Sequence, residues 1–392
     1  MTNCDVLVAG GGPAGSTCAW ALVRAGFDVV VIDRAAFPRD KVCAGWITPQ
    51  VIAGLGLDID AYRRGGRTCQ SISGFRTALI GGRSTVVTDY EYPVSFGIRR
   101  CEFDEYLLRR SGARLELGVP LASIRRSGGQ WVVNDQVSAP VLVGAGGHFC
   151  PVSRWVNGTD AATADASLVA AQEMEFALTE DEESECQVEG ARPEIYFSLD
   201  FRGYGWCFRK GRYLNVGLGR ADRRRLPEAT RAFAEFLRVS RHVPERPSLR
   251  WQGHAYRLNT ASTSSRRVLD DGVLLVGDSA GLAYRQSGEG IRPAIESGLL
   301  AARAIVEAGG RYTRERLAPY EQWVGERLGA GGHEVSLTGL LPDRLMARLG
   351  RSLLAVPLFV RSVVLDRWFL HAAEPAIAWT TEQLPALRRI RA

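Results

Sequence analysis

The sequence predicts an α/β fold: a Rossmann-like nucleotide-binding domain with an inserted, mainly antiparallel β domain and a C-terminal helical region. Three observations predict it. A glycine-rich turn near the N-terminus lies between an apolar strand and a helix, which is typical of a βαβ unit. Two later stretches, 77–98 and about 168–219, alternate apolar with polar residues and are rich in β-branched and aromatic types. From Ile291 onward, helical spacing dominates.

The first forty residues predict a dinucleotide site. "DVLVAG" and "DVVVID" are apolar strands, and "PAGSTCAWALVRAG" between them has helical spacing. The G-x-G-x-x-G turn allows a tight bend, close approach of a pyrophosphate and close helix packing, while an acid that ends the second strand binds a ribose diol. The predicted nucleotide-binding residues are Gly10, Gly12, Pro13, Ala14, Gly15, Asp33 and Arg34. This motif does not choose between FAD and NAD.

Composition narrows the classes of partner and compartment. The 392 residues are 46% hydrophobic and 23% charged, which suits a globular protein of more than one lobe. A net charge of +6 fits an anionic ligand or surface, but no basic run is interleaved with aromatic residues, so nucleic acid is not expected. Eight cysteines without C-x-x-C spacing predict free thiols. With no signal peptide and no apolar run of about 20 residues, we expect a cytoplasmic protein.

Several spaced motifs resemble those of known flavoenzymes. "GDSAGLAYRQSGEGIRPAIESG" at 277–298 resembles the second flavin-binding motif of FAD enzymes with the p-hydroxybenzoate hydroxylase fold, and "RRCEFDEYLL" at 99–108 resembles their Arg-x-x-Phe-Asp segment. "FPRDKVCAGWITP" at 37–49 and "YGWCFRKGRYLNVGLG" at 204–219 resemble two elements of geranylgeranyl reductases. The resemblance runs from residue 3 to about 330 and implies one non-covalently bound FAD.

The resemblance implies a second group of FAD-binding residues: Arg100, Asp278, Gly288, Gly290 and Ile291. Asp278 ends a predicted buried strand, where a carboxylate accepts a hydrogen bond from the ribityl chain. The glycines open a helix whose free N–H groups stabilise negative charge on a reduced flavin. Glu289 between them is either a helix-start carboxylate or a catalytic group.

The implied domain organisation is discontinuous. We expect an FAD-binding domain from residues 1–75, 97–165 and 265–330, a substrate domain from 76–96 and 166–264, and a C-terminal helical region at 331–392. The acidic run at 181–185 is expected at a solvated hairpin tip. The tail either caps the fold or lies on an anionic membrane surface, because its apolar residues are mixed with Arg344, Arg348, Arg351, Arg361 and Arg367.

The chain departs from the family pattern at three places, one of which is "GAGG" at 144–147, where relatives carry Gly-Ala-Asp-Gly. Tyr284 and Arg285 replace an Asn-Pro pair, and Arg209 replaces the proline of the Phe-Pro-Lys-Gly segment. We interpret an extra arginine near the cavity mouth as favouring an anionic or polar group in the substrate.

Three residues are the candidate catalytic groups: Cys43, His254 and Tyr256. The resemblance places Cys43 beside the flavin or the substrate cavity, where Lys41 favours its thiolate; the alternative is a small apolar filler. His254 and Tyr256 share one strand face and are either proton donors or structural residues. An aromatic set either lines an apolar cavity or belongs to an ordinary core: Tyr196, Phe197, Tyr204, Trp206 and Phe208. Cys150 is left open as a neighbour of Cys43.

The sequence and the resemblance together predict an FAD-dependent oxidoreductase. The first hypothesis is reduction of a C=C bond of a prenyl or other lipophilic substrate. The alternatives are a monooxygenase that hydroxylates an aromatic or peptidyl substrate, and a flavin-binding redox sensor without turnover. With one nucleotide motif in the chain, the flavin is expected to be reduced by transient NAD(P)H or by a separate electron-donor protein.

Overall fold

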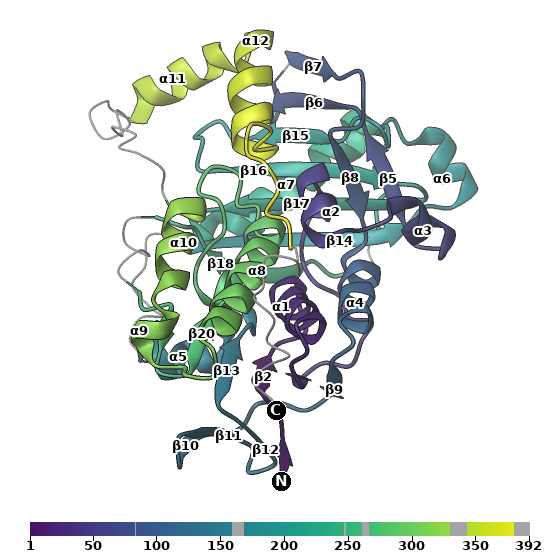
Figure 1. The fold of residues 1–392 in the computed structure, drawn as a ribbon. Helices are drawn as coiled ribbons and strands as arrows, with labels where there is room; N and C mark the ends of the chain where they lie inside the picture. The colour runs from purple at the N-terminus through teal and green to yellow at the C-terminus, as the bar shows by residue number, and fades with distance from the viewer. Residues whose placement is uncertain (83, 159–167, 247, 261–265, 330–342, 380–392) are drawn as a thin grey trace.

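The computed structural model describes the chain apart from residues 83, 159–167, 247, 261–265, 330–342 and 380–392 (Figure 1). Two large sheets lie one above the other in this view, with helices α1, α4 and α8 beside the lower one. Two further helices, α11 and α12, lie at the top edge beside the upper sheet.

The lower sheet is the predicted nucleotide-binding sheet. Its six strands have the order β19-β20-β13-β2-β3-β9, and every pair is parallel except β19 with β20. The predicted strands near 140–147 and 272–278 are confirmed as β13 and β20. The strands are β2 (Val6–Ala9), β3 (Val29–Asp33), β9 (Arg114–Leu117), β13 (Val141–Gly144), β19 (Leu269–Asp270) and β20 (Val273–Leu275).

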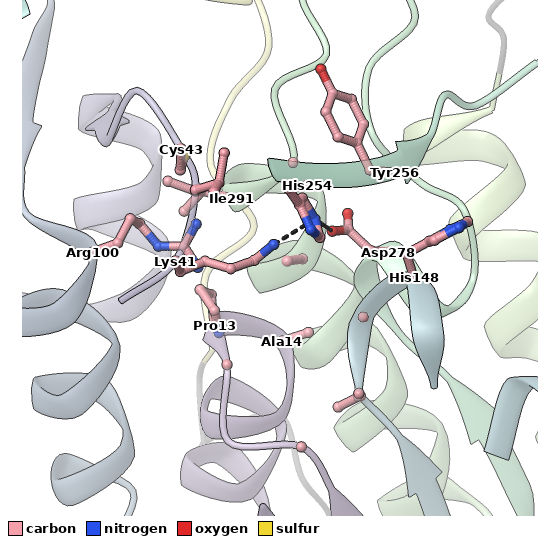
Figure 2. Close-up of a pocket in the computed structure, with 18 of the residues that line it drawn as sticks. Pro13, Ala14, Lys41, Cys43, Arg100, His148, His254, Tyr256, Asp278 and Ile291 are labelled. Carbon is pink, nitrogen blue, oxygen red and sulfur yellow. Dashed lines mark hydrogen bonds and ion pairs between the residues drawn. The ribbon is translucent and has the colours of Figure 1, made fainter. Parts of the chain in front are cut away.

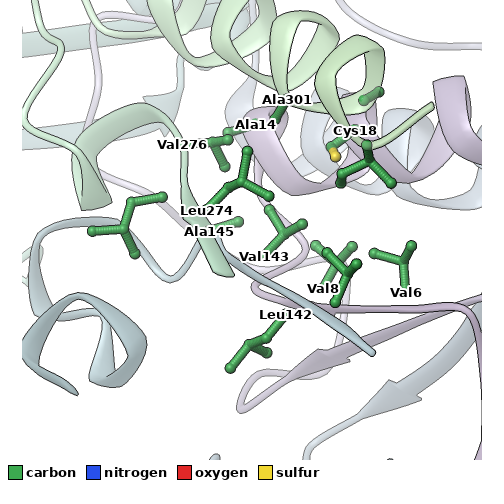
Figure 3. Packing of buried hydrophobic residues seen from close by; sticks show 14 of the residues in the cluster. Val6, Val8, Ala14, Cys18, Leu142, Val143, Ala145, Leu274, Val276 and Ala301 are labelled. Atoms are coloured by element: carbon green, nitrogen blue, oxygen red, sulfur yellow. The ribbon is translucent and has the colours of Figure 1, made fainter. Parts of the chain in front are cut away.

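Helices cover this sheet because its central strands are apolar on both faces. Helix α1 (Pro13–Arg24) packs against α8 (Ile291–Glu307), with α4 (Arg100–Arg110) beside it. A Cβ at Gly298 would lie 2.5 Å from the carbonyl oxygen of Ala14, so the two helices meet backbone to backbone. Figure 3 shows the resulting core, in which Val8, Val143 and Leu274 from three neighbouring strands face Cys18 and Ala301.

A small sheet lies below the main one, near the N-terminus (Figure 1). Its order is β1-β12-β11-β10. The strands are β1 (Thr2–Asn3), β10 (Ile124–Ser127), β11 (Gln130–Val133) and β12 (Val137–Ala139). Trp131 of β11 is fully buried and joins the core of the nucleotide-binding sheet.

The upper sheet has the order β18-β14-β17-β16-β15-β6-β7 and is antiparallel except for the pair β15 and β6, so the predicted mainly antiparallel sheet is confirmed. Helix α7 (Leu226–Arg241) packs on one face, where the ring of Phe233 lies against Gly205. The strands are β6 (Gly74–Leu79), β7 (Thr85–Asp89), β14 (Leu168–Ala177), β15 (Glu194–Phe197), β16 (Gly203–Lys210), β17 (Tyr213–Arg220) and β18 (Gln252–Arg257). The predicted domain boundaries stay a prediction.

A three-stranded sheet connects the two halves. Its order is β4-β8-β5, and it carries the motif at 37–49 into the space between the large sheets. Its strands are β4 (Trp46–Ile47), β5 (Cys69–Ile72) and β8 (Ser95–Ile98). Helices α2 (Pro49–Leu55) and α3 (Ile59–Arg64) lie between β4 and β5 in the chain.

The C-terminal region is helical where it is described. Helices α9 (Arg314–Leu317) and α10 (Pro319–Leu328) lie beside α8, whereas α11 (Asp343–Leu353) extends away from the body in Figure 1. Helix α12 (Pro357–Phe359) continues into a π-helical segment, η6 (Val360–Phe369). Val360, Val364 and Leu365 of this segment are fully buried against the upper sheet. The rest of the predicted region, 331–342 and 380–392, lies outside the described residues.

One local expectation was wrong. The acidic run at 181–185 is part of a helix, α6 (Glu180–Glu185), and not a hairpin tip. Thr179 and Glu182 form a capping box, in which each side chain bonds the other residue's backbone N–H. This Thr-x-x-Glu signature starts a helix and was present in the sequence.

Candidate flavin and substrate site

A cavity of about 780 Å³ lies between the two large sheets, within the size range of ligand sites. It is lined by the nucleotide turn, the 39–46 loop, β16, β18, the start of α8 and Phe369. Of the predicted cofactor residues, all but Gly15 line it: Gly10, Gly12, Pro13, Ala14, Asp33, Arg34, Arg100, Asp278, Gly288, Gly290 and Ile291. The predicted catalytic residues Cys43, His254 and Tyr256 also line it. The fold therefore brings these segments together, while their roles stay predictions.

The glycine turn leaves no room for side chains. Gly10 has φ +123°, and a Cβ there would lie 2.3 Å from the carbonyl oxygen of Ala145. A Cβ at Gly15 would lie 1.9 Å from the carbonyl oxygen of Gly10, which explains why Gly15 sits behind the cavity wall. At Gly12 a Cβ would approach the guanidinium of Arg39 at 3.3 Å. The cradle thus exposes backbone N–H groups at the start of α1, as a pyrophosphate requires.

Charged side chains lie around the glycine turn, where a dinucleotide needs them. The Asp33 carboxylate at the end of β3 accepts hydrogen bonds from the N–H groups of Gly11 (2.7 Å) and Ala35 (2.9 Å). Arg100 makes a bidentate pair with buried Asp104 at 2.8 and 2.9 Å. Arg39 lies 3.3 Å from the same carboxylate. Asp104 therefore holds two guanidinium groups at the cavity wall, where they favour an anionic ligand.

Lys41, His254 and Asp278 meet across the middle of the cavity (Figure 2). Lys41 Nζ lies 2.5 Å from His254 Nε2, which lies 3.8 Å from Asp278 Oδ2. Burial lowers the pKa of Lys41 to about 8, and burial also lowers the pKa of His254. Burial would raise the pKa of Asp278, but the neighbouring His254 and Lys41 outweigh it and hold that pKa below its usual value.

The segment before α8 forms the wall opposite the nucleotide turn. Gly288 has φ +66°, and a Cβ there would lie 2.4 Å from the hydroxyl oxygen of Tyr256. The Tyr204 hydroxyl donates a hydrogen bond to the carbonyl of Ser287. Gly290 is the N-cap of α8. Burial raises the pKa of Glu289 to about 7, while its carboxylate accepts a hydrogen bond of 2.7 Å from the Arg292 N–H. Glu289 both lines the cavity and caps the helix, so the structure shows the structural contact and leaves the catalytic role untested.

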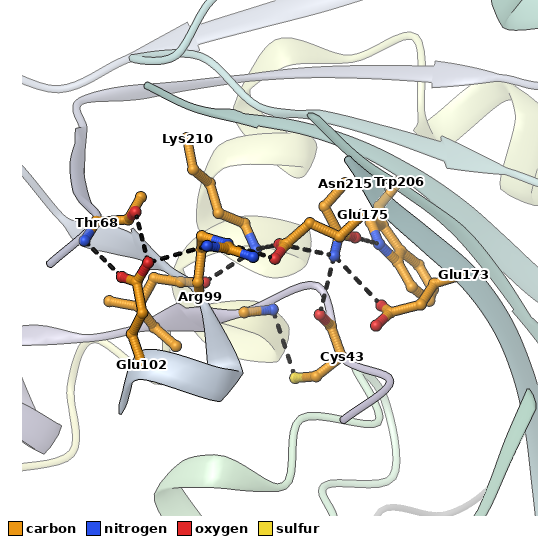
Figure 4. Close-up of polar contacts among 11 residues, drawn as sticks. Cys43, Thr68, Arg99, Glu102, Glu173, Glu175, Trp206, Lys210 and Asn215 are labelled. Atoms are coloured by element: carbon orange, nitrogen blue, oxygen red, sulfur yellow. Dashed lines mark hydrogen bonds and ion pairs between the residues drawn. The ribbon is translucent and has the colours of Figure 1, made fainter. Parts of the chain in front are cut away.

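The Cys43 loop is held by a buried polar network, which lies above it in Figure 4. Asn215 Nδ2 donates to the Cys43 carbonyl at 3.3 Å, and the Trp206 indole N–H donates to Asn215 Oδ1 at 2.7 Å. Glu173 accepts from the Cys43 backbone N–H, and burial raises the pKa of Glu173 to about 7. The network fixes both backbone groups of Cys43 while leaving its thiol beside Ile291 at the cavity.

The same network explains the motif at 204–219. Alternate residues Tyr204, Trp206 and Phe208 face the cavity, as strand periodicity requires. Lys210, two residues on, is fully buried; it donates to Glu175 at 2.8 Å and to the Ile98 carbonyl at 2.9 Å. Sequence analysis missed Glu173, Glu175 and Asn215. The signal that could have revealed them was a pair of acids, two residues apart, on an otherwise half-buried strand. Buried carboxylates need partners, so such a pair indicates a polar network.

Two residues of the aromatic set follow the alternative of an ordinary core, and the interpretation of the extra arginine was wrong. Tyr196 does not line the cavity: it packs against Phe233 and Phe236 on the α7 face, because neighbouring strand residues point to opposite sides. Phe197 faces the cavity side but contacts Phe201 and Phe369 instead of lining the space. The extra arginines are not at the cavity. Arg209 pairs with Glu183 at 2.8 Å, and Arg285 is exposed outside the lining.

Cys150, the other open question, is fully buried in the core of the nucleotide-binding sheet. Its thiol lies against Gly146, and it does not line the cavity. Cys43 packs at the edge of a different cluster, around Ile291 and Phe103. The two cysteines therefore belong to separate parts of the fold.

The fold and the site define an FAD-dependent oxidoreductase, and comparisons with known proteins agree. The FAD dependent oxidoreductase family model matches residues 5–76. A geranylgeranyl bacteriochlorophyll reductase-like protein from Thermoplasma acidophilum shares the fold, with a TM-score of 0.69 at 20% identity over 99% of this chain and 96% of that one. The halogenase PltM, solved with FAD, has a TM-score of 0.65 at 16% identity over 94% of this chain and 85% of its own.

Sequence relatives identify the family. The geranylgeranyl diphosphate reductase of Rhodobacter capsulatus is 31% identical over 324 residues, 77% of this chain and 75% of the relative. The menaquinone reductase of Mycobacterium tuberculosis is 28% identical, covering 77% and 76%. The chain belongs to the geranylgeranyl reductase family of FAD-dependent oxidoreductases. It is an enzyme of this class, so a flavin-binding sensor without turnover is set aside. In the described part of the chain, no helix is long and apolar enough to cross a membrane.

Proposed function

We propose that the enzyme reduces a C=C bond of a prenyl or other lipophilic substrate. The observation that carries this proposal is the contrast between the two ends of the cavity. One end has the glycine turn, Asp33 and arginines, while the other is lined by apolar and aromatic residues. These are Trp46, Ile195, Tyr204, Trp206, Phe208 and Phe369, and only the Tyr204 hydroxyl and the two indoles among them carry a polar group. Such a lining binds apolar groups by burial.

The assigned residues fit FAD. The glycine cradle and the N-terminus of α1 would hold the pyrophosphate, Asp33 the ribose, Asp278 the ribityl chain, and the start of α8 the flavin ring. When bound and reduced, FAD supplies a hydride equivalent. The chain's own residues then exclude water from the apolar end and present the proton that the second alkene carbon needs.

Cys43 is the first candidate for that proton, because its loop reaches the cavity and its backbone is fixed by Glu173 and Asn215. Tyr256 is the second. Burial raises the pKa of Tyr256 well above its usual value, so its hydroxyl stays protonated. His254 is engaged with Lys41, and because burial lowers its pKa, its protonated form is less populated than that of an ordinary histidine. The overall change is one hydride and one proton added across the double bond.

The electron source is proposed as either transient NADPH or NADH, or a reduced electron-transfer protein. The described chain has one glycine-rich nucleotide turn, and we assign it to FAD. Anaerobic mixing with NADH, NADPH and reduced ferredoxin or flavodoxin in turn is expected to bleach the flavin with at least one donor.

A monooxygenase is the second candidate, with an aromatic or peptidyl substrate. It is favoured by the shared fold of PqsL from Pseudomonas aeruginosa, which is described as a probable FAD-dependent monooxygenase. Its structure with 2-aminobenzoylacetate has a TM-score of 0.62 at 20% identity, over 89% of this chain and all of that one. The polar pair His254 and Tyr256 on the cavity wall would orient the polar groups of such a substrate.

Product mass separates the two candidates. The holoenzyme is incubated with an electron donor and geranylgeranyl diphosphate, farnesyl diphosphate or menaquinone, first without and then with dioxygen. The reductase adds two hydrogen atoms per double bond in both conditions. An oxygen atom in the product, formed only with dioxygen, supports the monooxygenase and refutes the reductase.

We also propose peripheral contact with an anionic lipid surface through α11 to η6. No acidic residue occurs between positions 344 and 365, and Arg348, Arg351 and Arg361 are exposed there. Between them, Leu349, Val356 and Leu358 are 46%, 45% and 74% exposed. Exposed apolar residues among arginines are typical of an interfacial segment. A lipophilic substrate would then reach the enzyme from the bilayer.

A further inference from the structure

Phe369 connects the C-terminal segment to the cavity. Among the described residues beyond Ala294, it is the one that lines this space. It ends η6 and is 3% exposed. Its ring packs edge to face against Trp46 (centroids 5.6 Å apart, 60°) and against Tyr204 (5.3 Å, 76°). A side chain far away in sequence therefore forms part of the apolar end of the site.

The aromatic residues around Phe369 pack closely against one another. Trp46 stacks on Phe208 at 5.3 Å and 11°, and meets Phe75 edge to face at 5.4 Å. Behind Phe369, the fully buried Val364 and Leu365 fill the space toward the solvent side of the segment. Packed rings do not separate without losing burial and dispersion contacts.

The space left for a substrate beside FAD is limited. One cavity of about 780 Å³ has to hold both FAD and the reacting part of the substrate. The cofactor residues take up the part from Asp33 to Asp278 and the start of α8. The part of the cavity between the Cys43 loop and the aromatic end is then left for the substrate, and Phe369 lines this part.

We propose that Phe369 sets the length of the substrate chain that fits beyond the reacting double bond. This inference rests on the proposed function, because it names the substrate feature selected at the same apolar end. Phe369→Ala removes the phenyl ring, which opens a volume similar to one isoprene unit. A hydrophobic pocket discriminates against even one surplus methylene by about tenfold or more, so an effect of at least this size is expected.

The test measures binding separately from turnover. The oxidised holoenzyme is titrated with geraniol, farnesol and geranylgeraniol, and the flavin spectrum reports binding. Wild type is expected to bind most tightly the alcohol that fills the space. Its affinity is expected to fall about tenfold or more for the alcohol that is one isoprene unit longer. Phe369→Ala is expected to move that limit to the longer alcohol. Phe359→Ala is the matched control, because Phe359 belongs to the same segment but packs against Trp368 and does not line the cavity.

Phe369→Leu is the control for folding, because it keeps a large apolar side chain. Melting curves of every variant show whether a substitution disturbs the fold. An equal length profile in wild type, Phe369→Ala and Phe369→Leu overturns the inference, as does the same shift in Phe359→Ala or a failure of all three alcohols to bind. If the limit moves in Phe369→Ala but no prenyl double bond is reduced by any variant, the inference holds and the proposed reaction fails.

Discussion

The ammonium nitrogen of Lys41 lies 2.5 Å from Nε2 of His254, the same imidazole nitrogen that faces the carboxylate of Asp278. One nitrogen accepts from Lys41 or donates to Asp278, but not both at once. The proton on Lys41 therefore decides which neighbour His254 engages. These three groups come from a loop, a strand of the upper sheet and the end of the lower sheet, so their charge state is shared between both halves of the site.

Lys41 should make the stability of the FAD-free protein depend on pH. Its pKa falls from 10.5 to about 8 through burial, so between these values the unfolded chain holds a proton that the folded chain has released. Stability from this group therefore increases as the pH rises from about 8 to about 10.5. We expect Lys41→Met to flatten the increase in Tm over this range. An unchanged slope would show that Lys41 titrates as an exposed lysine.

Glu173 should act in the opposite direction at lower pH. Burial raises its pKa from 4.5 to about 7, so between these values the folded chain holds a proton that the unfolded chain has lost. Its contribution is fully present below about pH 4.5 and decreases as the pH rises to about 7. Glu173→Gln is expected to lose this dependence, measured as the difference in Tm between variant and wild type across that range. A difference that does not change with pH contradicts a raised pKa.

Gly15→Ala should abolish FAD binding. Its Cβ would lie 1.9 Å from the carbonyl oxygen of Gly10, so the turn and the start of α1 must move apart. Gly253→Ala is the matched control, because a Cβ there meets nothing within 4 Å although the residue also lines the cavity. The visible flavin absorbance of the purified proteins is the measurement. A yellow Gly15→Ala protein with normal FAD content would refute the assignment of the cradle.

Cys43→Ser should retain FAD, because the phosphate and ribityl contacts come from other segments. If Cys43 relays the proton, turnover falls by a factor of about 10² or more. In wild type, a thiol reagent should also modify Cys43 more slowly with FAD bound than without it. Cys101 is the control, since it is half-buried like Cys43 but lies outside the cavity lining. Near-normal turnover in Cys43→Ser would show that the proton donor is Tyr256, His254 or water.

Leu358→Asp should weaken binding to vesicles that contain anionic lipid. Leu358 is 74% exposed, so the change removes an apolar contact and adds repulsion without disturbing the core. Sedimentation with anionic and with neutral vesicles is the measurement, and Val239→Asp, also exposed but on α7, is the control. Equal sedimentation of wild type with both vesicle types would rule out a charge-dependent surface.

The nucleotide half of the site could be predicted because it depends on local rules. Gly10, Gly15 and Asp33 occupy their positions within one βαβ unit, where the spacing of a strand, a turn and a helix fixes the geometry. The motif resemblance placed Asp278 and Arg100 at the same cavity, and the structure agrees that both line it. Only the βαβ unit follows from local rules, whereas Asp278 and Arg100 come from distant segments and required the resemblance.

The substrate half depends on which strand face turns inward and on contacts between distant segments. Tyr196 and Phe197 looked equivalent in sequence, yet they lie on opposite faces, and neither lines the cavity. The network of Glu173, Asn215 and Cys43 joins residues 172 positions apart in its longest link. Phe369 was not expected at the site at all. Side-chain periodicity gives alternation but not the register that would reveal such neighbours.

The position of Phe369 has an evolutionary consequence. The proposed cofactor segments contain Gly10 and Gly15, where a Cβ would meet backbone atoms within 2.3 Å, whereas the tail contributes only Phe369 to the described lining. Other tail residues hold the start of α8, since Arg292 donates to the carbonyls of His371 and Glu374. A change of substrate range by substitution in the tail is therefore expected at Phe369 itself and not by exchange of the whole segment.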